Sequence, residues 1–204
     1  MRIVFATGNK NKMKEIRQIL GDLGMEILSM AEAGVDGDVE ENGTTFSENS
    51  MIKAREVSRL LKEKNEADDS IVLADDSGLE VDYLGGEPGI YSARFMGHDT
   101  PYSEKNAAIL DKLAGVPDKD RTARFVCAIS AVFPDGKELS SLGKMEGIIG
   151  YEIAGVNGFG YDPIFFLPEY GKTSAEISPE EKNAISHRGK ALREMESLLK
   201  AELK

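Results

Sequence analysis

Residues 2–17 read RIVFATGNKNKMKEIR, and this stretch predicts a strand, a tight turn and a helix in immediate succession. Arg2 to Ala6 is an apolar run of the kind that forms a buried strand. The next residues, Asn11 to Leu20, repeat apolar side chains at helical spacing. Gly8 lies between the two elements, where it lets the backbone turn tightly and approach a ligand. A strand that leads through such a turn into a helix indicates an α/β protein.

The charge of this turn is unusual for the start of a helix. Three lysines lie where the helix dipole is already positive, which is unfavourable unless an anion binds there. Phosphate is the natural candidate, because backbone N–H groups and cations would hold it together. The candidate phosphate-binding residues are Thr7, Gly8, Asn9, Lys10, Asn11 and Lys12. The spacing of a P-loop or a dinucleotide fingerprint is absent, so a solvated basic helix start remains the alternative.

The composition limits the class of partner. The 204 residues carry a formal charge of −11, which argues against a nucleic-acid polymer, because a phosphate backbone requires a broad basic face. A small phosphorylated ligand needs only a local basic pocket. The apolar run Phe125 to Phe133 is far shorter than the roughly 18 residues of a membrane span, so we expect no membrane partner.

The cellular compartment is also predicted from the sequence. The N-terminus enters the first predicted strand without the charged and apolar regions of an export signal. A single cysteine, Cys127, fits a reducing environment and lies in a strand pattern. We therefore expect a cytoplasmic protein in which Cys127 packs in the core.

The remainder of the chain alternates between extended and helical patterns. Predicted strands cover Glu26–Met30, Ile71–Ala74, Leu79–Tyr83 and an antiparallel hairpin within Arg121–Ile149. Predicted helices begin near Thr45, Pro101 and Pro179, and a last helix carries apolar residues up to Leu203. The pattern predicts a mixed α/β fold in which helices flank the sheet, with one domain over residues 1–204 and an active-site cleft between two lobes.

A set of acidic residues forms the second candidate cluster. Asp75 and Asp76 follow a predicted buried strand, and strand ends in open α/β sheets are where ligands collect. Two adjacent aspartates repel each other, and a divalent cation such as Mg²⁺ would relieve that repulsion and bridge to substrate phosphates. The alternative is an ordinary acidic turn, since Asp75-Asp76-Ser77-Gly78 has good turn composition.

Other charged residues are candidates for a functional role only if they lie near this acidic cluster. The polar loop from Gly34 to Gly43 carries Asp36, Asp38, Glu40 and Glu41, for which a solvated loop is the simpler interpretation. Glu48 belongs to a capping-box pattern with Thr45. Lys53 falls on an apolar helical stripe, so its ammonium group either reaches the surface or turns inward to orient a carboxylate or a water near Asp76.

Two further clusters lie toward the C-terminus. Glycines next to aromatics in Gly158–Pro163 suit a loop that stacks on a flat ring, with Asp162 as an acceptor; an aromatic core corner is the alternative. In the second cluster His187 and Arg188 can donate to a purine carbonyl at position 6, and Lys182 could add charge or stack over a ring. Taken alone, that cluster is better explained as a surface helix junction.

Together these segments resemble the inosine-triphosphate-pyrophosphatase family, whose members hydrolyse non-standard purine nucleoside triphosphates. The resemblance covers essentially the whole chain, and its six motifs occur in order at compatible spacing. They lie in Ala6–Lys12, Glu41–Ala54, Ala74–Leu79, Gly85–Arg94, Phe159–Pro163 and Ser186–Gly189. One departure is Ser50, where the family usually has alanine.

The resemblance implies a role for each candidate residue. Thr7 to Lys12 would hold the triphosphate of a purine nucleoside triphosphate. Glu41 and Asp76 would hold Mg²⁺, and Asp76 would also be the general base. Asp75 and Lys53 would support this metal centre. Ser77 would contact the substrate. The base pocket would consist of Phe159, Gly160, Tyr161, Asp162, Lys182, His187 and Arg188. The family is typically homodimeric. A nucleotide sensor that does not hydrolyse its ligand and a phosphatase that releases orthophosphate remain alternatives.

Overall fold

The structure of the protein is a computed structural model that describes residues 1–35, 37, 39–64 and 69–203. Asp36 and Asp38 of the predicted polar loop lie outside the described residues. The strands are β1 (Arg2–Phe5), β2 (Glu26–Ser29), β3 (Ser70–Val81), β4 (Thr122–Val132), β5 (Glu138–Ile149), β6 (Phe165–Leu167) and β7 (Lys172–Thr173). The α-helices are α1 (Lys10–Leu20), α2 (Phe46–Glu63), α3 (Tyr102–Lys112), α4 (Pro179–Ile185) and α5 (His187–Glu202).

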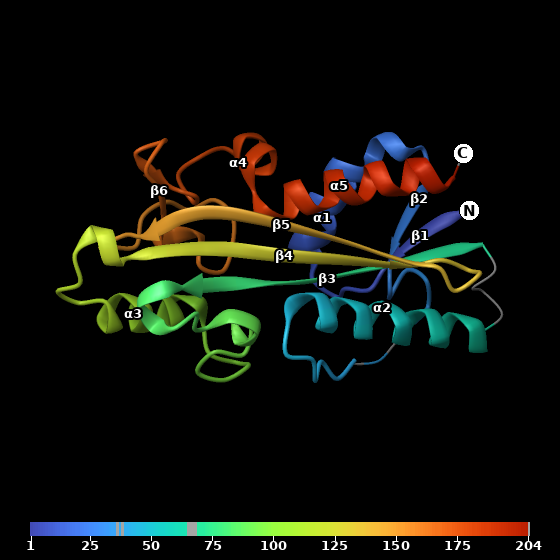
Figure 1. Ribbon diagram of the computed structural model, residues 1–204, viewed down its shortest axis with the longest axis horizontal. Coiled ribbons are helices and arrows are strands. Elements are labelled where there is room, and N and C mark those ends of the chain that lie inside the picture. Colours follow the sequence, from blue (N-terminus) through green and yellow to red (C-terminus); the bar gives the residue numbers. More distant parts are fainter. Residues whose placement is uncertain (36, 38, 65–68, 204) are drawn as a thin grey trace. The chain divides into compact units, whose positions relative to one another are not determined.

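The seven strands form one mixed sheet in the order β2-β1-β3-β4-β5-β6-β7 (Figure 1). β1 pairs in parallel with both β2 and β3, whereas β6 pairs antiparallel with β5 and β7. β4 and β5 form the predicted hairpin: backbone bonds join Phe133 to Lys137 beside the turn and Ile149 to Arg121 at the far end. The predicted mixed α/β fold is therefore confirmed.

The chain divides into two compact units. Unit 1 comprises Met1–Asp76, Cys127–Gly143 and Arg188–Lys204, and unit 2 comprises Ser77–Val126 and Lys144–His187. The strands β3, β4 and β5 each contribute residues to both units. The cleft expected from the sequence stays a prediction.

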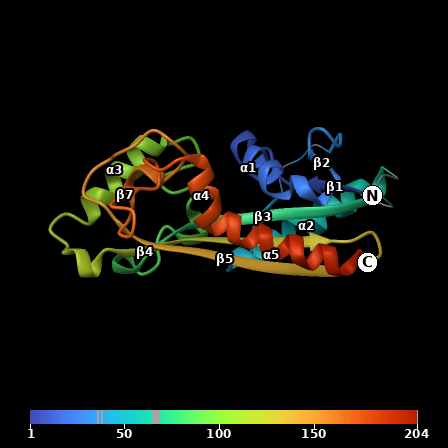
Figure 2. The same ribbon diagram turned by 90° about the horizontal axis from the view of Figure 1, so that it is seen from above.

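Unit 1 has three layers, because alternate strand residues face opposite sides of the sheet. Ile3 and Phe5 of β1 belong to a core cluster with α1 and α5, together with Leu73 of β3. Val4 and the neighbouring strand residues pack instead against Ala54, Val57 and Leu61 of α2. Figures 1 and 2 show α2 on one side of these strands and α1 and α5 on the other. Cys127 is fully buried in the first cluster, as predicted.

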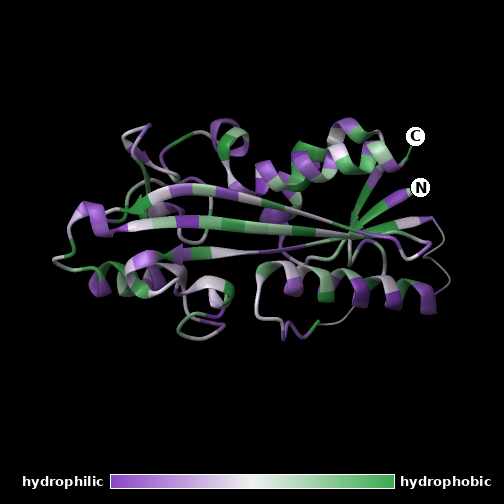
Figure 3. Cartoon of the chain, in the orientation of Figure 1, coloured by the Kyte–Doolittle hydropathy of each residue, from purple (hydrophilic) through white to green (hydrophobic). Residues whose placement is uncertain are grey.

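Unit 2 has its own core. Leu79 and Val81 at the end of β3 pack with Ile109 of α3 and with Leu113 just after that helix. Apolar residues of β4, β5 and β6 complete this core. In Figure 3 most of β4 is coloured hydrophobic, which fits a strand that supplies buried residues to both units.

The predicted capping box at Thr45 and the predicted helix start near Pro179 are confirmed. Thr45 and Glu48 form a complete capping box at the start of α2, and Ser178 and Glu181 form another at α4. Such boxes satisfy N–H groups that have no partner inside the helix, and this fixes where each helix begins. The C-terminal helix was predicted too long at its end: Leu203 lies beyond α5 and is exposed.

One predicted turn is wrong. The segment Asp75-Asp76-Ser77-Gly78 was expected to end one strand and precede another, yet β3 runs without a break from Ser70 to Val81. Turn composition misleads here because partners that are distant in the sequence, Lys12 for Asp75 and the Asn49 amide for Asp76, hold both aspartates inside the strand. The described helices include none with the length and hydrophobicity needed to cross a bilayer.

Candidate active site

The loop between β1 and α1 is built largely by its own side chains. Asn9 caps α1, and its Oδ1 accepts the N–H groups of Asn11 at 2.9 Å and Lys12 at 3.2 Å. Thr7 Oγ1 accepts the N–H of Asn9 at 3.2 Å. Thr7 and Asn9, which were expected to offer hydrogen bonds to a ligand, thus also shape the loop. The first turn of α1 contains no acidic residue, so its positive end remains suited to an anion.

Of the two roles expected for Gly8, a tight turn and the close approach of a ligand, the structure does not support the first. Its φ does not lie in the left-handed region, so the turn does not require glycine for its conformation. The direction in which a Cβ would point is open, with no atom within 4 Å. A glycine at this place therefore leaves room beside the loop, which suits the close approach of a ligand rather than a tight turn.

Asp75 is surrounded by cations from three helices. The two carboxylate oxygens of this fully buried residue lie 3.0 Å and 2.9 Å from Lys12 Nζ. Arg188 Nη2 at the start of α5 lies 3.3 Å from Oδ2, and Lys53 Nζ of α2 donates to the backbone carbonyl of Asp75 at 3.0 Å. Burial alone would raise the pKa of Asp75, but the charges of Lys12, Arg188 and Lys53 hold the pKa below its ordinary value. Asp75 is thus a permanent anion.

The same network reaches back to α1. Arg188 Nη1 donates to Glu15 Oε2 at 2.6 Å, and Arg188 is almost fully buried. Lys12 and Glu15 lie three residues apart on one face of α1, so that helix supplies both a cation for Asp75 and an anion for Arg188. The structure places the Arg188 guanidinium on these carboxylates of unit 1, and the base-pocket role expected for Arg188 stays a prediction.

Asp76 has the opposite electrostatic environment. Burial raises the pKa of Asp76 to about 6, and the negative charge of Glu41 adds to the effect. The ammonium of Lys53 and a 3.1 Å hydrogen bond from Asn49 Nδ2 oppose the rise only in part. A carboxyl with such a pKa can take and release a proton near neutral pH.

Lys53 connects the two carboxylate environments. It forms an ion pair with Glu41 in addition to its bond to Asp75 O, so its ammonium turns inward rather than to the surface. Burial lowers the pKa of Lys53, but the charges of Asp75 and Glu41 outweigh burial and raise it. Lys53 therefore stays charged beside Asp76.

The adjacent aspartates point to opposite faces of β3. Asp75 meets α1 and α5, whereas Asp76 meets Asn49 of α2. Their mutual repulsion accordingly raises the pKa of Asp76 less than burial and Glu41 do. Successive strand residues face away from each other, so the repulsion within the pair is a weak reason for a cation, and a cation at these aspartates stays a prediction.

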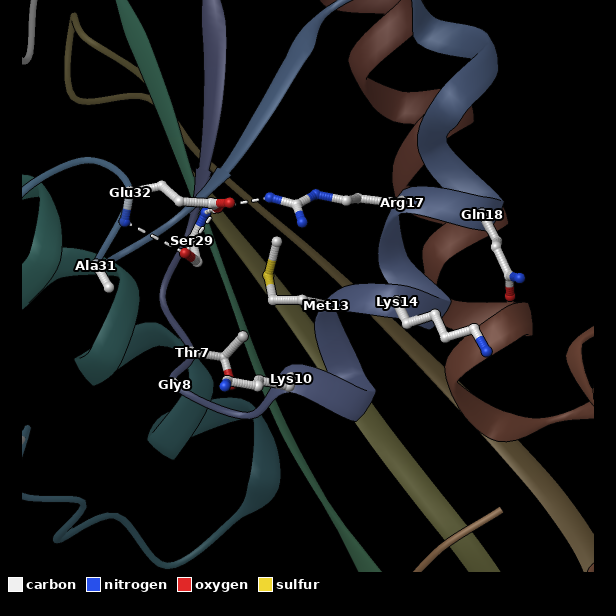
Figure 4. Close-up of a pocket in the computed structure, with 10 residues that line it drawn as sticks. All are labelled: Thr7, Gly8, Lys10, Met13, Lys14, Arg17, Gln18, Ser29, Ala31 and Glu32. Atoms are coloured by element: carbon white, nitrogen blue, oxygen red, sulfur yellow. Dashed lines mark hydrogen bonds and ion pairs between the residues drawn. The ribbon is translucent and has the colours of Figure 1, made fainter. Parts of the chain in front are cut away.

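Two cavities border the phosphate-type loop within unit 1. The larger, of about 750 Å³, lies between α1 and the residues after β2 (Figure 4). In Figure 4 Arg17 reaches across to the Glu32 carboxylate, which also accepts hydrogen bonds from Ser29. The smaller cavity, of about 320 Å³, is lined by Thr7, Gly8, Glu41 and Lys53 among others. We regard the smaller cavity as the candidate reaction site, because it alone of the two includes the acidic residue and lysine beside Asp76.

A second group of predicted residues comes together in unit 2. Asp162 is buried and receives three hydrogen bonds: from Lys182 Nζ at 2.6 Å, the Phe159 N–H at 2.8 Å and Ser174 Oγ at 2.7 Å. Lys182 Nζ also lies 5.2 Å from the centre of the Phe159 ring. Gly158 is required here, because its φ is +72° and a Cβ would lie 2.2 Å from Asp162 Oδ2. The loop thus presents Phe159 next to a buried ion pair.

The remaining predicted base-pocket residues also lie in unit 2. The His187 ring stacks on Phe125, with centroids 4.9 Å apart and planes 16° apart. Tyr161 is buried and donates through its hydroxyl to Ser92 O at 2.8 Å, which indicates a structural role. Ser77 is the first residue of unit 2 on β3 and is half-buried.

The described contacts sort the predicted residues into two groups. Unit 1 holds those assigned to phosphate, metal and catalysis, together with Arg188. Unit 2 holds Phe159 to Asp162, Lys182 and His187, with Ser77. Glu40 and Glu48 do not enter either group: Glu48 caps α2. Sequence reasoning gave no role to Glu15, Asn49 or Ser174; the three-residue spacing of Lys12 and Glu15 was the one available signal.

Comparison with known proteins is consistent with this arrangement. The model of the Ham1 family matches residues 3–198. The chain belongs to the Ham1 family. A relative from Clostridium perfringens, called dITP/XTP pyrophosphatase, is 51% identical over 203 residues, which cover 100% of this chain and 99% of the relative. The solved Ham1 protein of Staphylococcus aureus has a TM-score of 0.86 at 40% identity and covers 99% of this chain. A HAM1 protein from Coxiella burnetii has a TM-score of 0.87 at 39% identity.

Proposed function

We propose that the protein hydrolyses non-standard purine nucleoside triphosphates, namely ITP, dITP and XTP, to the nucleoside monophosphate and pyrophosphate. The observation that carries this proposal is the pair Asp75 and Asp76: one carboxylate is held ionised by cations, and the other has a pKa of about 6 beside a basic loop. The dITP/XTP pyrophosphatases among its relatives match over nearly their full length, which supports the same substrate class. Such an activity would remove deaminated purines from the nucleotide pool.

The residues around Asp76 suit a Mg²⁺ ion as cofactor. The negative charge of Glu41 raises the pKa of Asp76, because the two carboxylates are close enough to repel each other. Among the described residues no cluster of three or more acidic, histidine or cysteine ligands occurs, and Mg²⁺ needs only one or two carboxylates when substrate phosphates and waters complete its shell. Bound there, the metal would neutralise charge on the phosphate oxygens.

The chain's own residues would do the rest of the chemistry. Asp76 would take the proton of a water that attacks the α-phosphorus, since its pKa lies near neutral pH. Lys12 and the start of α1 would hold the phosphates, with Thr7 to Asn11 shaping the loop. Lys53 would keep Asp76 oriented and offset the negative charge of the leaving pyrophosphate.

Selectivity for the base would come from unit 2. Phe159 can stack on a purine, and His187 and Lys182 can donate hydrogen bonds to a 6-oxo group. Adenine presents a 6-amino donor at that place, so the donors of the pocket would be left unpaired, which is a strong basis for rejection. Arg188 would join this pocket only after leaving Asp75 or Glu15.

We further propose that the protein acts as a cytoplasmic homodimer. The single buried cysteine and the acidic surface charge fit that compartment. Sedimentation analysis of the purified protein tests the dimer directly, and a sedimentation coefficient of a 22.2 kDa monomer at micromolar concentration would refute it.

Phosphorus NMR of ITP incubated with protein and Mg²⁺, with ATP in parallel, tests the activity. Monophosphate and pyrophosphate from ITP alone are expected, and the Asp76→Asn variant should give neither. Orthophosphate would instead identify a phosphatase. Binding of ITP without hydrolysis would identify a sensor. Equal hydrolysis of ATP would refute the selectivity assigned to unit 2.

A further inference from the structure

Two adjacent polar side chains of α3, Lys105 and Asn106, are buried in unit 2, and the proposed reaction uses neither. Lys105 Nζ donates to Ala93 O at 2.7 Å, and Asn106 Nδ2 donates to Gly160 O at 3.1 Å. The acceptors belong to two loops that are far apart in the sequence. One turn of one helix therefore holds the backbone of both loops.

The second of these loops contains Phe159, the ring proposed to stack on the purine. Gly160 follows Phe159 directly and has a φ of +69°, a conformation that favours glycine. A Cβ on Gly160 would lie 3.6 Å from the ring of Tyr102, which is the first residue of α3. The loop is also fixed by Tyr161, whose ring meets Tyr102 edge-on with centroids 5.3 Å apart. The backbone next to Phe159 is thus shaped by α3.

Only the nitrogen of the Asn106 side-chain amide forms a hydrogen bond within the described part of the protein. Its Oδ1 is buried and has no hydrogen-bond partner among the described residues. A buried acceptor without a partner destabilises the folded state, so an apolar side chain at this place would remove that cost and offset the loss of the hydrogen bond to Gly160 O. The feature that the amide adds is its one hydrogen bond, from Nδ2 to Gly160 O.

We propose that Asn106 is a positioning residue for purine selectivity. Its bond to Gly160 O sets the path of the loop at Gly160, and through it the placement of the Phe159 ring beside Lys182 and Asp162. Asn106 itself does not touch the substrate. This inference rests on the proposed function of the same pocket, and it adds a selectivity determinant on a helix outside the pocket.

The test replaces Asn106 by leucine, which has a similar volume and no polar atoms. Because the unpartnered Oδ1 and the hydrogen bond to Gly160 O are lost together, the two effects offset, and the midpoint of urea denaturation should stay close to that of the wild type. Calorimetry with inosine monophosphate should nevertheless show at least a fivefold weaker affinity, while inorganic pyrophosphate, which has no base, should bind unchanged. The kcat/KM ratio of ITP over ATP should fall at least fivefold, mainly through KM for ITP. Ala107→Leu, on the exposed side of the same helix, is the matched control and should change none of these values.

Three outcomes would overturn the inference. Unchanged affinity for inosine monophosphate in Asn106→Leu would show that the bond to Gly160 does not position the ring. Equal weakening of inosine monophosphate and pyrophosphate would show a general structural effect, as would a lower denaturation midpoint. If the wild type binds inosine monophosphate but does not hydrolyse ITP, the proposed activity fails, yet the affinity comparison still decides the role of Asn106.

Discussion

Replacing Asp76 by asparagine should stabilise the protein while abolishing turnover. Asp76 is only 7% exposed, and its pKa is raised from an ordinary 3.8 to about 6, first by burial and then by Glu41. At about 1.4 kcal/mol per pKa unit, the ionised carboxylate costs the folded state about 3 kcal/mol. Asparagine carries no charge, and its carbonyl oxygen can still accept the hydrogen bond from Asn49 Nδ2.

The sign of the pH dependence follows from the raised pKa. Below about pH 3 the carboxyl of Asp76 is protonated in both the folded and the unfolded state, so the wild type and the variant should be equally stable. Between about pH 4 and pH 6 the unfolded state ionises while the folded state keeps its proton, so the wild type loses stability relative to the variant. Above about pH 6 the difference should remain constant.

Urea denaturation at pH 8 and pH 4, with a chelator present, measures this difference. The variant should be more stable by about 3 kcal/mol at pH 8, which corresponds to roughly 6–12 °C in Tm for a chain of this size. Added Mg²⁺ should raise the stability of the wild type more than that of the variant. Asp111→Asn, an exposed carboxylate on α3, is the control and should stay within about 0.5 kcal/mol. Equal or lower stability of Asp76→Asn at pH 8, or a gain at pH 4 that is as large as the gain at pH 8, would refute the reasoning.

Three other predictions use single variants or a single reagent. Lys12→Met should raise KM for ITP at least tenfold in steady-state kinetics, because it removes the cation at the start of α1, whereas Lys14→Met, two residues along, should change KM less than twofold. Lys182→Met should destabilise the protein by about 3–5 kcal/mol in urea, because it leaves the buried Asp162 carboxylate without its cation; a double variant that also changes Asp162 to leucine should recover much of the loss. Cys127 should not react with a thiol reagent in the native protein at pH 8 and should react fully in denaturant, because burial raises its pKa to about 12; fast native labelling would contradict its place in the core.

The sequence predicts elements whose signals are local. The helix after Gly8, both capping boxes and the β4–β5 hairpin are found where expected, because side chains within a few residues determine them. The continuity of β3 through Asp75 and Asp76 could not be predicted in this way. The cations that make charged residues tolerable there come from α1, α2 and α5, which are distant in the sequence.

The candidate site shows the same limit. The residue types and motifs indicate phosphate, metal and ring binding, but spacing alone does not say which partner each side chain has. Arg188 pairs with Asp75 and Glu15, and Asn49 holds Asp76, and none of these contacts follows from a pattern in the chain. Glu15 and Asn49 are polar residues on amphipathic helices, where a solvated position is the usual outcome.

The division of labour between the two aspartates follows from the alternation of β3 rather than from their adjacency. One residue of shift along a strand reverses the face to which a side chain points. Asp75 therefore meets Lys12 and Arg188 and is held ionised, whereas Asp76 meets α2 and Glu41 and keeps a pKa of about 6. Consecutive residues thus supply two different carboxyl groups: Asp75 is an anion that anchors Lys12, and Asp76 is able to take a proton. Had both aspartates lain in a turn, as the composition suggested, both carboxylates would have been hydrated, and neither pKa would have been shifted by burial in this way.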